Sequence, residues 1–167
     1  MSAFATDIAA ITASIRASTG PDRVTDALIQ MRFRPHASDP KPEALERIED
    51  TGEDLRFVYL ARHKDGRPVT GCWGYHVSRP VTSNLAAVEA FVEQLLPGAY
   101  WHVAKGRQTP KEPLYGAAIW RDGKPGSGER DPDVIDEHAS SSALAFLLAA
   151  LEAWDLAQSR PAANGTL

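Results

Sequence analysis

Two helix patterns, each preceded by a pair of strand patterns, constrain the fold of this chain most strongly. The first helix is predicted for Leu85 to Leu95, and the second begins near Ala139 to Ser142 and runs to about Ala157. Superposing Leu85 on Leu144 also aligns other apolar positions of the two helices. The chain is therefore predicted to contain a strand–strand–helix unit twice.

Four stretches rich in β-branched and aromatic residues supply the predicted strands. An Asp-Gly turn signal at Asp65-Gly66 connects the first pair, and Gly106 to Pro113 is the predicted loop of the second pair. Because hairpin-connected strands pair antiparallel, each pair is expected to be antiparallel. The strands are predicted at Phe57–Arg62, Val69–Val77, Ala99–Ala104 and Leu114–Trp120.

Two short helices are predicted before these units. Ile8, Ile11 and Ile15 have helical spacing. Gly20-Pro21 ends that helix and opens a second one, where Asp22 places a carboxylate near the helix N-terminus.

The segment that follows is rich in proline and charge. Pro35 to Pro42 is a predicted loop. A short helix is predicted from Pro42 through Leu45 and Ile48, ending by Gly52.

These elements predict an α/β (α+β) fold, a three-layer α/β/α sandwich whose four-stranded, mainly antiparallel sheet is built from two ββα units. The two long helices cover one face of that sheet, and the N-terminal helices cover the other. A chain of 167 residues suits a single domain, predicted for residues 1–159. Residues 160–167 carry Pro and Gly without an apolar period and are predicted to be a flexible C-terminal tail.

Charge and composition argue against several classes of function. The net charge of −4 argues against a duplex nucleic-acid partner, which needs a basic surface. The longest apolar run, Ala143 to Leu151, is too short to cross a bilayer, so no membrane partner is expected. The N-terminus lacks a secretory pattern, and a cytoplasmic location is expected. The one cysteine, Cys72, forms no internal disulfide and is predicted to be a buried core thiol.

No pattern of catalytic, metal-binding or cofactor-binding residues stands out. The acidic run from Asp131 to His138 lacks the mid-loop glycine of a calcium site and is predicted to be a solvated loop before a helix. The stretch from Gly123 to Gly128 does not open a helix as a phosphate loop must. No two histidines have the helical spacing of a zinc motif. Ser140 to Ser142 suits helix capping better than nucleophilic catalysis. We therefore expect no catalytic residue, no metal and no cofactor.

Aromatic residues in the predicted strands, with basic residues near the strand ends, form the candidate ligand site. Aromatic faces beside guanidinium groups suit base stacking and phosphate pairing. They equally suit a protein interface, or a core between sheet and helices, since three layers bury both faces of a sheet. The candidate ligand-binding residues are Trp73, Tyr75, Trp101, His102, Arg107, Trp120 and Arg121.

Three stretches of the chain form an ordered pattern: Ile11–Arg23 with Asp26 and Ile29, Arg79–Val88 ending at Leu96-Pro97, and Ala139–Ala153. In order and spacing they resemble the phage ABA-sandwich domain proteins of prophages and tailed phages. The resemblance implies a three-layer α/β/α fold and a phage or prophage protein in the cytoplasm of a bacterial host. That family has no established common activity, so it implies no catalytic residue. The segment from Pro35 to Gly66 departs from it by being longer and more charged.

Three functions stay open at this point. The first is a non-enzymatic phage or prophage accessory protein, with a role such as counter-defence, that binds a host protein or sequesters a small nucleotide signal. The second is a small metal-dependent or hydrolytic enzyme that uses His102 or the run from Asp131 to His138. The third is a structural or virion-associated module. Exposed aromatic residues in a domain of this size also favour a homo-oligomer.

Overall fold

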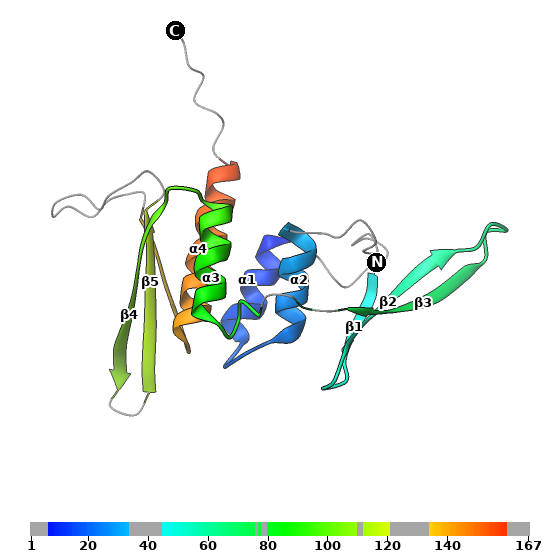
Figure 1. Ribbon diagram of the computed structural model, residues 1–167, viewed down its shortest axis with the longest axis horizontal. Helices are drawn as coiled ribbons and strands as arrows, with labels where there is room; N and C mark the ends of the chain where they lie inside the picture. Colours follow the sequence, from blue (N-terminus) through cyan, green and yellow to red (C-terminus); the bar gives the residue numbers. More distant parts are fainter. Residues whose placement is uncertain are drawn as a thin grey trace, which may run out of the picture.

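The computed structural model describes residues 7–33, 45–75, 77, 80–109, 112–120 and 134–159, which contain four helices and six strands (Figure 1). The helices are α1 (Ile8–Ala17), α2 (Arg23–Phe33), α3 (Leu85–Leu95) and α4 (Ser142–Ser159). The strands are β1 (Leu45–Asp50), β2 (Leu55–Arg62), β3 (Pro68–Tyr75), β4 (Tyr100–Thr109), β5 (Glu112–Trp120) and β6 (Val134–Ala139).

The strands form two separate antiparallel sheets of three strands each. Sheet A has the order β1-β2-β3, and sheet B has the order β4-β5-β6. Phe57 marks the middle of sheet A, where it pairs with Ile48 and Trp73. Ile119 has the same place in sheet B, between Trp101 and Ile135. The helices lie between the two sheets, so that the layers run sheet B, α3 and α4, α1 and α2, sheet A (Figure 1).

Helix α4 is the centre of the main core. Apolar residues surround most of its circumference, which is the pattern of a helix buried on several sides. Sheet B covers one side, where Trp101 packs on Phe146 with ring centroids 4.7 Å apart. Helices α1 and α3 cover other sides with their own buried apolar residues. The fully buried residues of α4 include Leu144, Leu147, Leu148 and Leu151.

Sheet A has a smaller core of its own. Its buried members are Leu45, Leu55 and Phe57 from the sheet, and Ala27 and Met31 from α2. The β2–β3 hairpin extends beyond this cluster and away from the helices (Figure 1). Its turn has a glycine at the predicted place, Gly66, whose φ of 84° lies in the left-handed region that favours glycine.

The coarse prediction of an α+β fold with antiparallel hairpins is confirmed. The prediction of one four-stranded sheet between helical layers is wrong, because six strands form two sheets and the helices lie between them. Both additional strands, β1 and β6, are short and rich in charge. Their side chains face solvent in part, so they lack the apolar run by which the other strands were recognised.

Several local predictions change for the same reason. The short helix predicted from Pro42 to Gly52 is wrong at Leu45–Asp50, which is strand β1. The acidic run ending at His138 is not a loop over residues 134–138, which belong to β6. The loop predicted at Gly106 to Pro113 is shorter, because β4 continues to Thr109 and β5 begins at Glu112. The backbone pairing of a hairpin extends a strand beyond its apolar residues.

Predictions based on capping chemistry are confirmed. As predicted for the serines before α4, Ser141 Oγ accepts a hydrogen bond from the backbone N–H of Leu144 at 3.2 Å. The structure adds a similar cap at α3, where the Asn84 side chain accepts from Ala87 N–H at 3.3 Å. Asp22 caps α2 by accepting from Val24 N–H at 2.9 Å. Cys72, however, is exposed on β3 rather than buried. The predicted tail, residues 160–167, lies outside the described residues.

Candidate functional site

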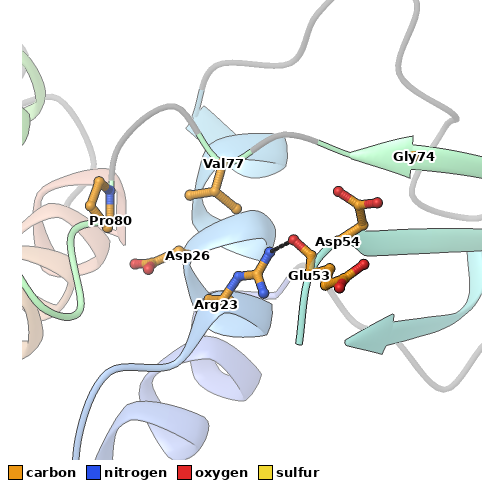
Figure 2. Close-up of a pocket in the computed structure, with 7 residues that line it drawn as sticks. All are labelled: Arg23, Asp26, Glu53, Asp54, Gly74, Val77 and Pro80. Atoms are coloured by element: carbon orange, nitrogen blue, oxygen red, sulfur yellow. Dashed lines mark hydrogen bonds between the residues drawn. The ribbon is translucent and has the colours of Figure 1, made fainter. Parts of the chain in front are cut away.

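A pocket of ≈ 530 Å³ lies between α2, sheet A and the segment that leads into α3 (Figure 2). It contains three carboxylates and one guanidinium, which makes it the first place to look for chemistry. The lining residues are Arg23, Asp26, Glu53, Asp54, Gly74, Val77 and Pro80.

Asp26 is the buried acid of this pocket, with only 2% of its surface exposed. Its carboxylate accepts hydrogen bonds from the backbone N–H of Thr82 at 2.7 Å and from Thr82 Oγ1 at 3.0 Å. Burial disfavours the charged form and raises the pKa of Asp26 to about 6, against the effect of the Thr82 hydrogen bonds and with a smaller contribution from nearby Asp22. The two hydrogen bonds from Thr82 to Asp26 hold the segment that leads into α3 against α2.

Arg23 fixes the other side of the pocket. Its guanidinium lies 3.2 Å from Asp50 Oδ1 and donates to the carbonyl oxygens of Gly52 at 2.9 Å and Glu53 at 3.2 Å. Figure 2 shows Arg23 directed at the β1–β2 turn and Asp26 directed at the Pro80 side. Because both residues are engaged in holding elements together, we interpret this pocket as a structural junction rather than a ligand site.

Sheet B offers a different kind of surface. Its inner face packs on α4 through Trp101, Ala117 and Ile119. Side chains alternate between the two faces of a strand, and paired residues of adjacent strands share a face. The residues that alternate with the inner set, together with their cross-strand partners, therefore form the outer face. We call the following residues the open face of sheet B: Tyr100, His102, Gly116, Ala118, Trp120, Asp136 and His138.

An aromatic pair occupies one end of the open face. Tyr100 is 51% exposed although it is a large apolar side chain. It pairs across the strands with half-buried Trp120, and their rings meet edge to face with centroids 6.2 Å apart. The geometry is that of an attractive aromatic pair, so two rings are held in place at the surface.

Polar side chains from the two outer strands flank the rest of the open face. Exposed His102 on β4 and exposed Asp136 on β6 both pair with Ala118 of the central strand. His138 of β6 pairs with Gly116, where an added β-carbon would lie 3.2 Å from His138 Nε2. The imidazole thus lies across the glycine, and the central strand contributes only small residues here.

The structure divides the predicted ligand residues between two sheets. Trp73 and Tyr75 belong to β3 of sheet A, opposite Phe57 and Leu55. Trp101 is a core residue of sheet B, as its contact with Phe146 shows.

Three of the remaining predicted ligand residues belong to sheet B. His102 and Trp120 lie on the open face. Arg107 is on β4 opposite Pro113, and Arg121 lies outside the described residues. The predicted ligand residues do not include Asp136 and His138, which the sequence places in an acidic loop and which the structure brings to this face on β6.

Among the described residues, no group of three or more His, Cys, Asp or Glu is arranged to hold a metal ion. No helix in the described part of the chain is long and apolar enough to cross a membrane. The enzyme hypothesis built on His102 or the acidic run stays a prediction, as does the resemblance to phage ABA-sandwich proteins. No protein-family model, curated protein sequence or solved structure matches this chain significantly.

Proposed function

We propose that this protein is a binding protein that engages a partner protein through the open face of sheet B. The observation that carries the proposal is the Tyr100–Trp120 pair, an ordered aromatic pair on the sheet face opposite α4. Tyrosine and tryptophan are enriched at the centres of protein interfaces, where their rigid rings supply contact area at low entropic cost. Ala118, between His102 and Asp136, has only a small side chain, so a partner can approach the central strand closely there.

The charge on the open face favours a protein over a nucleotide. Among the residues that define the open face, none is Lys or Arg. With the histidines neutral, Asp136 is the only one of them that carries a charge at neutral pH. The nearby Lys105 is turned toward Tyr115, with its ammonium 5.5 Å from the ring centroid. A nucleotide site needs cations for its phosphates, whereas the centre of a protein interface is depleted of charge.

The biological setting of the proposal is a phage or prophage accessory protein that acts without catalysis on a host protein. The resemblance of three sequence stretches to phage ABA-sandwich proteins supports this setting. A face that binds and blocks a host target is sufficient for a counter-defence role and requires no catalytic residue.

Photo-crosslinking in bacterial cells tests the proposal. A photoreactive phenylalanine analogue is placed at Tyr100 and, as the matched control, at Gln94, which is exposed on α3. We expect a discrete crosslinked protein from position 100 that is missing from position 94, identified by mass spectrometry. Tyr100→Ala should then weaken binding of that purified protein by about 10- to 100-fold. Equal crosslinking from both positions, or undiminished binding by the variant, contradicts the proposal.

Thermal denaturation distinguishes a protein partner from a nucleotide ligand. If the partner is a protein, a panel of linear and cyclic nucleotides should leave the midpoint of denaturation unchanged. Stabilisation by a nucleotide that disappears in Tyr100→Ala would assign the open face to a nucleotide signal instead of a protein.

A further inference from the structure

The outer edge of β3 differs from the other sheet edges of this protein. Each three-stranded sheet has two edge strands, β1 and β3 in sheet A, and β4 and β6 in sheet B. Among the described residues, no strand pairs with the side of β3 that faces away from β2. An unpaired edge presents a row of backbone N–H and C=O groups that can pair with another chain.

The other three edges carry features that discourage strand pairing. Four of the six residues of β1 are charged, and its register shifts between Leu45 and Arg47. Strand β4 carries Lys105 and Arg107 and has a shift beyond Arg107. Strand β6 is six residues long and contains three titratable side chains in succession. Charges, short length and bulges are the devices by which proteins protect edge strands.

Strand β3 lacks charge, short length and a register shift, and of the known protective features it has only a proline, Pro68, at its first residue. Its sequence, PVTGCWGY, contains no charged residue. Its eight residues pair one-to-one with β2 without a shift of register. Val69, on this edge strand, is 44% exposed, and the hairpin that carries β3 extends away from the helices (Figure 1). The strand is therefore long, regular, uncharged and placed at the periphery.

We propose that β3 pairs with β3 of a second copy of this chain, which joins two sheets A into one continuous six-stranded sheet. A two-fold axis between two identical strands makes them antiparallel, the geometry that sheet A already uses. Self-pairing of β3 places no charged side chains opposite one another. Self-pairing of β1 would place its charged side chains beside those of the copy, whether or not their charges are opposite. Pairing of β3 with a copy's β1 would continue into a filament, and the charges and register shift of β1 oppose it.

Two exposed side chains on the same hairpin supply a matched pair of variants. Val69 on edge strand β3 is 44% exposed, and Leu60 on central strand β2 is 49% exposed. Replacing either by lysine removes a similar apolar surface, but only Val69→Lys places charges beside the new strand pair. Sedimentation velocity over a range of concentrations should show a dimer for the wild type. We expect Val69→Lys to raise the dimer Kd about tenfold and Leu60→Lys to change it less than about threefold.

The single cysteine provides a second readout. A two-fold axis near the middle of β3 brings the two exposed Cys72 side chains close together across the new pair. A short bis-maleimide should therefore crosslink the wild type and Leu60→Lys to dimers, and Val69→Lys far less. Circular dichroism checks that each variant is folded, and Thr70→Lys replaces Val69→Lys if that variant is not.

Three outcomes would overturn the proposal. The first is a wild type that stays monomeric at the highest soluble concentration, and the second is equal weakening by Val69→Lys and Leu60→Lys. The third is a dimer that Tyr100→Ala dissociates while Val69→Lys does not, which would place the contact on sheet B. The proposal does not rest on the proposed function, because the two surfaces belong to different sheets.

Discussion

The two halves of this molecule have the same order of elements but different packing. Strands β1 to β3 are followed by α3, and strands β4 to β6 are followed by α4. In the second half, α4 returns to cover sheet B. In the first half, α3 packs against α4, and sheet A is covered by α2 instead.

The helices themselves explain the difference. Helix α4 has ten buried residues in 18, all apolar, so it needs cover on several sides. Helix α3 buries only Val88, Phe91 and Val92, a single stripe that α4 can satisfy. Sheet A is left with α2, whose buried residues include the polar Thr25, Asp26 and Gln30. The two halves therefore have the same order of elements but different packing, because α4 packs against sheet B, α1 and α3 at once.

The largest expected effects separate the two cores. Leu148→Ala should leave a cavity in the fully buried centre of α4 and lower the free energy of unfolding by about 2–5 kcal/mol. Urea denaturation followed by tryptophan fluorescence measures this change.

Phe57→Ala should act mainly on sheet A, whose core is small. Hydrogen exchange of the β2 and β3 amides should accelerate in Phe57→Ala while that of the α4 amides does not.

The comparison of halves fails if the two variants behave alike. If Phe57→Ala accelerates exchange in α4 as much as in β2, the molecule is one cooperative unit. Leu148→Val is the milder control, because it removes less volume and should cost less than the alanine variant.

The next largest effect concerns the junction between the halves, where the pKa of Asp26 is raised to about 6 from 3.8. Between these values the folded state holds a proton that the unfolded state has released. The free energy of unfolding therefore falls as pH rises from about 4 to about 6, by at most about 3 kcal/mol, and then levels off. Asp26→Asn keeps an acceptor for the Thr82 N–H and should abolish this dependence.

Denaturation at several pH values measures the effect. Thr82→Val is an informative partner variant, because it removes a hydrogen bond that favours the ionised form and should move the transition to higher pH. An unchanged pH dependence in Asp26→Asn would assign the transition to another group.

A smaller effect is expected within sheet A, where the ring of Tyr59 lies over Gly71. A β-carbon at Gly71 would overlap Tyr59 Cζ, whereas nothing lies within 4 Å of the same position at Gly74. Gly71→Ala should therefore displace the ring and cost about 1–2 kcal/mol. Gly74→Ala on the same strand is the control and should change stability by less than about 0.5 kcal/mol. Thermal denaturation of both variants tests the difference, and equal midpoints would contradict it.

How far the sequence predicts this fold depends on the type of signal. Apolar periodicity and capping residues predict α3, α4 and the aromatic strands, because the apolar residues that these elements bury form a regular pattern in the sequence. The sequence does not predict strands β1 and β6, since these segments are held as strands by pairing with β2 and β5 rather than by an apolar pattern of their own. The separation of the two sheets was also missed, because it depends on which helix covers which sheet.

The candidate site follows the same division. His102 and Trp120 were predicted as ligand residues and lie on the open face of sheet B. Trp101, next to His102, points to the opposite face and packs in the core. A strand alternates its side chains, so neighbouring aromatic residues cannot share a face. Asp136 and His138 join the face only because β6 pairs with β5.

The smallest expected effect compares two arginines that join the N-terminal helices to the two halves at the surface. Arg16 of α1 pairs with Glu137 of β6 and Glu152 of α4, on the sheet B side. Arg23 of α2 holds the β1–β2 turn through Asp50 and two carbonyl oxygens. Both side chains are more than 40% exposed, so Arg16→Gln and Arg23→Gln should each cost about 1 kcal/mol or less. Their local effects should differ, because α1 is also held by Ile8, Ile11 and Ile15 in the main core. Hydrogen exchange should accelerate at residues 50–54 in Arg23→Gln and change little in β6 in Arg16→Gln; the reverse result would mean that sheet A is the more firmly held of the two.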